Sequence, residues 1–337
     1  MKRRLDHRLR LLSFILLISL PAVAVSRERA LLGSSQNQSI PKPNQPAPYA
    51  IRASVDLVVL RAIVRDHKGA PVSGLTQENF QVYEDKVLQR IESFSHEDIP
   101  VTVGLVIDNS GSMRPKVSDV IAAALAFARS SNPKDEMFVV NFNERVSMGL
   151  PANLPFTSNA AQLEKALSRN AITGMTALYD AISVGLEQLQ KGKWDTKVLI
   201  VVSDGGDNAS KNNLAQVLSM LNQSSAAIYT MGIFDENDED RNPHVLKQLS
   251  RASGGEAFFP ETLQDILPIC EQIAHDIRSQ YTITFVPANR KQDGAYRAID
   301  LKAREASGGR RLSVSTRAGY SAPSSLNVSD RSQSNRP

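Results

Sequence analysis

The chain has 337 residues, 42% of them hydrophobic and 22% charged, which is the composition of an ordinary globular protein. Its formal net charge of +4 comes entirely from the first 24 residues, where five basic side chains accompany one acid, so the remainder is formally neutral. A neutral body gives no indication of nucleic-acid binding, and the length favours two domains over one.

The first 24 residues have the pattern of a secretory signal peptide. Basic residues precede an apolar stretch from Leu11 to Leu20, and the small-residue sequence Ala22-Val23-Ala24 follows. The apolar stretch is shorter than the ~20 residues that a spanning helix needs, and no cysteine near the cleavage site could carry a lipid. We therefore expect cleavage after Ala24 and a secreted or periplasmic bacterial protein without a stable membrane anchor.

Residues 25–50 are rich in Ser, Gln, Asn and Pro, which predicts a flexible linker. Across residues 51–98 short alternating apolar stretches are separated by turn residues, which predicts a β module. Its strands are expected at 55–64, 80–83 and 89–94, with a single-turn helix between the first two that Thr76 caps.

Residues 99–280 alternate between apolar strands and amphipathic helices. This order predicts an α/β domain with a doubly wound, mostly parallel sheet and helices on both faces. The expected strands are 101–107, 137–142, 198–202, 227–233 and 256–259, and the expected helices are 118–130, 160–167, 177–189, 214–221, 243–250 and 263–278. The only cysteine, Cys270, cannot form an internal disulfide and lies in a helical pattern, which indicates a buried structural thiol.

Strand patterns return in residues 281–320, and the tail 321–337 is Ser-, Asn- and Arg-rich, which predicts disorder. The strands before and after the α/β domain would each be marginal alone, because small sheets expose too much of their apolar face. We therefore expect 51–98 and 281–320 to join in one β-sandwich-like module into which the α/β domain is inserted.

The most informative segment is 101–113, where a strand apolar on both faces ends at Asp108 and is followed by Ser110 and Ser112. In open α/β sheets ligands bind at the carboxyl ends of the strands. Thr176, at the start of a helix, and Asp204, after the strand 198–202, are expected at the same edge. Such an oxygen-only set suits Mg²⁺, with Mn²⁺ or Ca²⁺ as alternatives, and leaves the ion electrophilic toward an outside carboxylate.

These three loops resemble the metal-ion-dependent adhesion site of the von Willebrand factor A (VWA) domain family, in the form found in exported bacterial proteins. All five positions of the family motif match, as Asp108, Ser110, Ser112, Thr176 and Asp204, and the resemblance covers about residues 100–280. It implies direct coordination by the two serines, action of the two aspartates through water, and a Thr176 that changes between the two shells. It also implies adhesion to a protein partner that donates an Asp or Glu to the metal.

Two other interpretations stay open. A metal-dependent hydrolase or phosphatase could use the same loops, but it needs a general acid or base, and His67, His96, His244 and His275 are expected away from them. No nucleophile elbow or phosphate-binding loop is present, so no catalytic or cofactor-binding residue is assigned. Alternatively Ser110 and Ser112 only cap a helix and Asp204 only forms a turn.

Two further acidic features flank the expected site. The stretch 235–240 lacks the spacing of an EF-hand and is expected to be a solvated loop that tunes the charge preference for a partner. Asp207 follows Gly205 and Gly206 in what is expected to be a turn, and it is kept as a reserve group behind the metal ligands.

Overall fold

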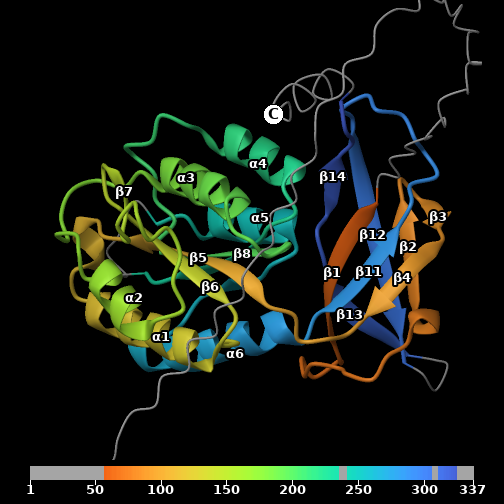
Figure 1. Ribbon diagram of the computed structural model, residues 1–337, viewed down its shortest axis with the longest axis horizontal. Helices are drawn as coiled ribbons and strands as arrows, with labels where there is room; N and C mark the ends of the chain where they lie inside the picture. Colours follow the sequence, from red (N-terminus) through yellow and green to blue (C-terminus); the bar gives the residue numbers. More distant parts are fainter. Residues whose placement is uncertain (1–56, 235–240, 306–309, 325–337) are drawn as a thin grey trace, which may run out of the picture. The chain divides into compact units, whose positions relative to one another are not determined.

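The computed structural model describes residues 57–234, 241–305 and 310–324 (Figure 1). The predicted signal peptide, the linker and the acidic stretch 235–240 lie outside the described residues. Within the described ranges no helix is long and apolar enough to cross a membrane. The strands form two sheets, one of six strands and one of eight.

The six-stranded sheet belongs to the predicted α/β domain and has the strand order β10-β9-β8-β5-β6-β7. The four pairings from β10 to β6 are all parallel, and only β7 runs antiparallel, after a tight turn from β6. The strands are β5 (Val101–Asp108), β6 (Glu136–Phe142), β7 (Val146–Met148), β8 (Thr196–Ser203), β9 (Ala227–Gly232) and β10 (Ala257–Phe258). All eight residues of the central β5 are buried, as its apolar sequence predicts.

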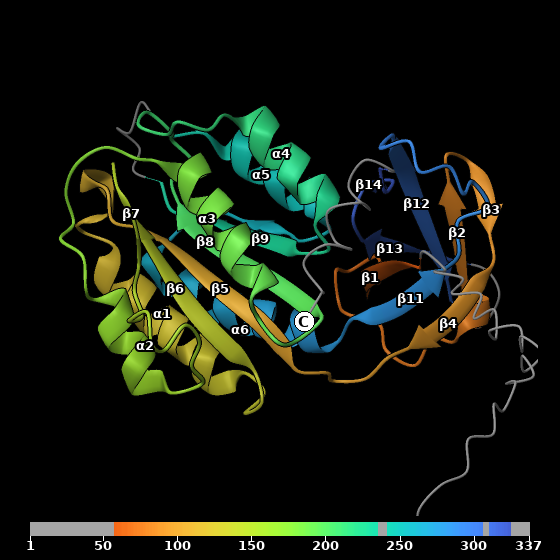
Figure 2. The same cartoon turned by 45° about the horizontal axis from the view of Figure 1, so that its top comes forward.

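Helices cover both faces of this sheet (Figure 2). They are α1 (Val117–Ser130), α2 (Ala160–Leu167), α3 (Leu178–Gln190), α4 (Leu214–Gln223), α5 (Pro243–Ser253) and α6 (Ile266–Arg278). Val106 of β5 lies against Gly185 of α3, whereas the next side chain, Ile107, shares an apolar cluster with α1 and with Cys270 of α6. Successive side chains of a strand point to opposite faces, so the doubly wound fold is confirmed.

The eight-stranded sheet combines strands from before and after the α/β domain. Its strands are β1 (Val58–Arg65), β2 (Phe80–Glu84), β3 (Val87–Gln89), β4 (Ile91–Ser95), β11 (Tyr281–Phe285), β12 (Tyr296–Arg304), β13 (Arg311–Ser315) and β14 (Gly319–Ser321). β1 pairs with β11 through its first five residues and with β13 through its last three, and β2 pairs with β12. All these pairings are antiparallel, so an additional antiparallel module accompanies the α/β domain.

This antiparallel sheet folds over on itself. Three strands separate β2 from β11 along the hydrogen-bonded path, which would place them about 19 Å apart in a flat sheet. The rings of Phe80 in β2 and Tyr281 in β11 nevertheless have centroids only 5.2 Å apart. Both belong to one buried cluster with Leu60, Val82 and Leu301, so the module has a core of its own.

Three local features differ from the sequence-based expectations. The segment 87–95 forms two short strands with different partners, since β3 pairs with β2 and β4 pairs with β11. The strand β14 was not expected. It extends to Ser321, and Ser324 bridges to Asp293, so regular pairing continues into the first residues of the predicted tail.

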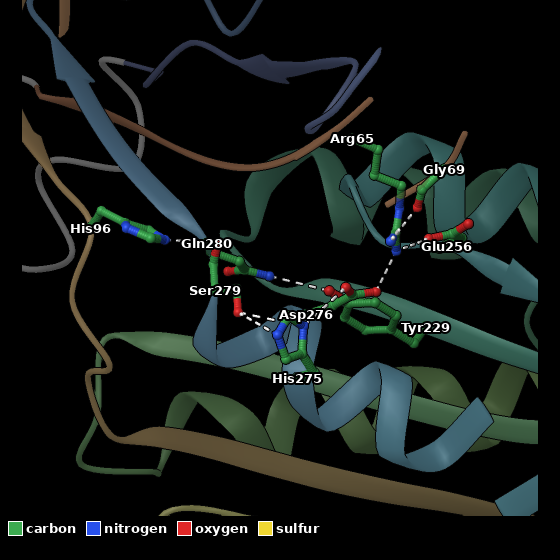
Figure 3. A network of polar contacts seen from close by, with 9 residues as sticks. All are labelled: Arg65, Gly69, His96, Tyr229, Glu256, His275, Asp276, Ser279 and Gln280. Atoms are coloured by element: carbon green, nitrogen blue, oxygen red, sulfur yellow. Dashed lines mark hydrogen bonds and ion pairs between the residues drawn. The ribbon is translucent and has the colours of Figure 1, made fainter. Parts of the chain in front are cut away.

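A buried ionic network joins β1 to the α/β domain (Figure 3). Nη2 of Arg65 lies 2.5 Å from Oδ2 of Asp276 in α6 and 3.0 Å from Oε2 of Glu256, which precedes β10. The side chain of Asp276 is 1% exposed, and burial raises the pKa of its carboxyl even though Arg65 opposes this. Beside it, the Gln280 amide donates to the buried Tyr229 hydroxyl at 3.1 Å. Arg65 is thus the cationic partner that makes burial of Asp276 tolerable.

Replacing Arg65 by Ala should therefore lower the free energy of unfolding by about 3–5 kcal/mol, because the Asp276 charge stays buried without its partner. Chemical denaturation of the full chain measures this. Arg90→Ala, which removes an exposed ion pair with Glu92, is the matched control and should change stability by less than about 1 kcal/mol. Equal effects of the two substitutions would contradict the assigned role of Arg65.

Candidate metal centre

The two candidate aspartates lie at one edge of the parallel sheet because their strands are neighbours in register. Ile107 of β5 is opposite Val202 of β8, so Asp108 and Asp204 come next to each other at the carboxyl ends of these strands. Both are buried, with 0% and 3% of their surfaces exposed. The strand pairing alone therefore brings two carboxylates together, at the edge where the sequence predicts the site.

Hydrogen bonds fix both carboxyl oxygens of Asp108. Oδ1 accepts from the backbone N–H of Ser110 at 2.8 Å, and Oδ2 accepts from the Ser203 hydroxyl at 2.7 Å. The sequence analysis did not identify Ser203. Its signal is positional, because the last residue of β8 lies beside the last residues of β5 and can reach the carboxylate there.

The first and third loops are joined through side chains. The hydroxyl oxygens of Ser110 and Ser112 are 3.1 Å apart, and Ser112 donates to Oδ2 of Asp204 at 2.7 Å. The other oxygen of Asp204 accepts from the backbone N–H of Gly206. Four of the five predicted residues, Asp108, Ser110, Ser112 and Asp204, thus belong to one hydrogen-bonded cluster.

The capping interpretation does not account for this arrangement. Ser110 is the N-cap of a short 3-10 helix, Gly111–Met113, but its side chain makes no capping hydrogen bond. The Ser112 hydroxyl donates to a carboxylate on another loop. Helix α1 begins after Lys116, which also provides no side-chain cap. The two serine hydroxyls are therefore turned toward the acidic cluster, where a cap would turn them to backbone N–H groups.

Thr176 is held beside this cluster by backbone hydrogen bonds. Its N–H donates to the Asn208 side chain at 2.9 Å, and its carbonyl accepts from the N–H of Asn208 at 3.0 Å. Two residues earlier, the Gly174 carbonyl accepts from the N–H of Gly111 at 3.2 Å, which ties the second loop to the first. Among the described residues the Thr176 hydroxyl has no hydrogen bond to the other four predicted ligands. Asn208, which the sequence analysis missed, positions this loop from the third one.

Gly174 is favoured by its left-handed backbone and lies close to an acidic side chain. It has φ of +87°, and a Cβ at this position would lie 1.7 Å from Oε2 of Glu144. The exposed Glu144, in the turn between β6 and β7, thus adds a third carboxylate next to the loop that carries Thr176. Nothing in the sequence pattern connected Glu144 to the site.

The electrostatics of the cluster fit a cation. Burial, and secondarily the charge of Asp204, raise the pKa of Asp108 to about 6. In the described part of the chain neither aspartate has an ion pair, and the buried Lys116 donates to the carbonyl of Ile233 at 2.9 Å instead. Two neighbouring carboxylates that share hydroxyl groups and lack a cationic side chain suit a hard divalent ion. No group of three or more His, Cys, Asp or Glu side chains in the described ranges could hold a metal, so a centre here depends on hydroxyl ligands.

The remaining candidate groups lie outside the cluster. Asp207 accepts from the N–H of Tyr179 and from the Ser210 hydroxyl, at 3.2 and 2.6 Å, so it holds the start of α3. His96 stacks on the ring of Tyr281, which belongs to β11 of the antiparallel module. His244 was expected away from the three loops, but the start of its helix, α5, lies beside the site. There the N–H of Asn242 donates to the Asp204 carbonyl at 3.0 Å.

Comparison with known proteins places this geometry in a family. Residues 103–206 match the von Willebrand factor type A domain family. An uncharacterised protein of Synechocystis is 24% identical over 178 residues, which are 52% of this chain but only 41% of that protein. A von Willebrand factor type A protein from Catenulispora acidiphila is similar over 81% of this chain and 75% of its own, with 13% identity and a TM-score of 0.47.

The domain of the type V pili tip protein Mfa5 from Porphyromonas gingivalis is similar over 53% of this chain and 95% of its own, with 14% identity and a TM-score of 0.44. The family match spans β5, all three loops and the five candidate residues. Residues 103–206 thus match a von Willebrand factor type A domain.

Proposed function

We propose that this protein is an exported interaction module that binds a protein partner through a divalent cation at the carboxyl edge of its parallel sheet. The observation that carries the proposal is the contact between loops, in which the Ser112 hydroxyl bridges Ser110 and Asp204. This contact brings the oxygen atoms of two separate turns together. They lie beside the carboxylate of Asp108, which no described side chain neutralises.

The ligand set that we propose is Asp108, Ser110, Ser112, Thr176 and Asp204, with Mg²⁺ as the ion and Mn²⁺ or Ca²⁺ as substitutes. Bound there, the ion would supply an electrophilic point for a carboxylate of the partner, because three of its five proposed ligands are neutral hydroxyls and a sixth coordination position would stay free. The protein's own part is to hold the ligands in place. Ser203 fixes Asp108, and Asn208 fixes the backbone of Thr176.

We favour a binding module over a metal-dependent hydrolase or phosphatase. Proton transfer requires an acid or base within hydrogen-bond reach of the reacting atoms. No histidine in the described ranges hydrogen-bonds to the five residues, and His275 contacts Ser279 and Asp276 in the network of Figure 3. An adhesive site needs only the ion and an approaching carboxylate.

Isothermal titration of the metal-free full chain with Mn²⁺ and Mg²⁺ tests the ligand set. Asp108→Ala should abolish saturable uptake, and Ser112→Ala should weaken it by about tenfold, since a hydroxyl ligand and its bond to Asp204 are both lost. Asp300→Ala and Ser219→Ala remove the same chemical groups from exposed positions on β12 and α4 and should leave the affinity unchanged. Uptake by Asp108→Ala equal to that of the unsubstituted chain would refute the site.

Partner recognition can be tested with displayed peptides that carry a central Glu or Asp, each matched to the same peptide with Gln or Asn. The full chain should retain only acidic peptides, only with Mg²⁺ present, and Asp108→Ala should retain none. Retention that persists in excess chelator, or that ignores the change from Glu to Gln, would show that binding does not use a metal-bound carboxylate.

The buried Asp108 also predicts a pH dependence of the metal-free protein. Its pKa is raised from 3.8 to about 6 on folding, so the folded state binds a proton more tightly than the unfolded state. The free energy of unfolding should therefore fall as pH rises from about 4 to about 6, by about 3 kcal/mol from this group. Denaturation in chelator across this range measures it. Asp108→Asn should remove this contribution, and an unchanged pH profile in that variant would contradict it.

A further inference from the structure

A cleft of 630 Å³ lies between the C-terminal ends of α3 and α4 and the strands β1 and β14. Gln190 at the end of α3 and Asn222 to Ser225 at the end of α4 line one side, and Val59, Arg317 and Tyr320 line the other. Because α3 starts beside the candidate metal centre and has 13 residues, the cleft is about 20 Å from that centre. Its volume is in the range of small-molecule sites.

The cleft is cationic. Four basic residues line it, Arg290, Lys291, Arg297 and Arg317, and no Asp or Glu is among the described residues that do. Polar groups without charge fill much of the remaining wall, including Gln190, Gln223, Ser224 and Ser321. A wall of this kind offers many hydrogen-bond donors and a positive potential, which is the chemistry of an anion site.

Arg317 carries a charge that the protein does not neutralise. Its Nε donates to the Gly319 carbonyl at 2.8 Å and its Nη2 to the Asn222 carbonyl at 3.3 Å, but neither acceptor is charged. No ion pair of Arg317 exists in the described part of the chain. Burial lowers the pKa of its guanidinium, and the nearby charge of Arg61 lowers it further. Two guanidinium groups therefore repel each other at this wall.

Arg61 is the second of these groups. It is two residues after Val59 on β1, so its side chain leaves the same face of the strand as that of the cleft-lining Val59. Its Nε is buried and has no hydrogen-bond partner. Asp195 is the acid that acts on it, and burial nevertheless keeps the pKa of Arg61 below its usual value. A buried donor without an acceptor is costly. Arg61 is not itself among the residues that line the cleft, so it would act on an anion there through its charge.

The nearest buried acid is already engaged elsewhere. Glu84 lies 3.6 Å from Nη1 of Arg297 and accepts from the Tyr320 hydroxyl at 2.7 Å. Arg297 is 3% exposed, and its terminal nitrogens also donate to the carbonyls of Asn289 and Lys291. Glu84 therefore balances Arg297, and Asp195 is the acid that acts on Arg61. Arg317 has no ion pair with a described acid.

We propose that this cleft binds a small anionic molecule, whose carboxylate or phosphate group pairs with Arg317 under the field of Arg61 and whose remaining polar groups meet the amide and hydroxyl side chains of the wall. The site is separate from the metal centre and does not rest on the function proposed for it.

The test uses the full chain in the presence of a chelator, so that no metal binds at the candidate metal centre. Inorganic phosphate and citrate are titrated at constant ionic strength against chloride, and binding is followed by calorimetry and by the shift in unfolding temperature. At least one of the two anions should bind saturably, and the preferred one tells phosphate chemistry from carboxylate chemistry. Arg317→Gln and Arg61→Gln should each weaken that binding by about tenfold or more.

Two more variants keep the test decisive if the buried arginines prove necessary for folding. Arg290→Gln together with Lys291→Gln removes two exposed charges of the cleft wall and should also weaken binding. Arg304→Gln removes an exposed arginine of β12 outside the cleft and should not. No response to either anion beyond that to chloride, or equal binding by the cleft variants and Arg304→Gln, would overturn the proposal.

Discussion

The parallel register of β5 and β8 is the constraint on which the candidate site depends. It places Asp108 and Asp204 side by side at the end of a sheet that helices cover on both faces, where water cannot screen their charges. Hydroxyls from neighbouring residues satisfy the carboxylate oxygens, but no described side chain cancels their charge. A buried pair of this kind is stable only if a proton or a cation accompanies it. The fold thus places two buried carboxylates together without a described cationic side chain. The adhesive function that we propose depends on a metal ion that would balance this negative charge.

Much of the α/β domain could be predicted from sequence because each strand is a short apolar run that ends in a polar turn. The strand 101–107 and the helix 160–167 were placed within a residue of their observed bounds. The same pattern predicted Asp108, Ser110, Ser112 and Asp204 at one edge, and the structure brings these four together. The metal itself and the role of Thr176 stay predictions.

The supporting residues were not predictable in the same way. Ser203 and Asn208 act through contacts between loops that are far apart in sequence, and a lone Ser or Asn has no periodic signal. The strand β14 was missed because it has three residues and begins at a glycine. In the sequence, Arg65 is only a charged residue at the end of a mostly apolar strand. Its ion pair with Asp276 is visible only once β1 is packed near α6.

The divided pairing of β1 has a consequence for how the chain acquires its structure. Ile63 is paired with Ser315, about 250 residues further along, whereas the strand pairings of the parallel sheet all lie within residues 101–258. During vectorial synthesis the middle of the chain can fold while β1 still waits for its partners, since long-range strand pairing is slow and needs the last residues. Until then β1 lacks both of its partner strands, β11 and β13, so the early strands complete their pairing last.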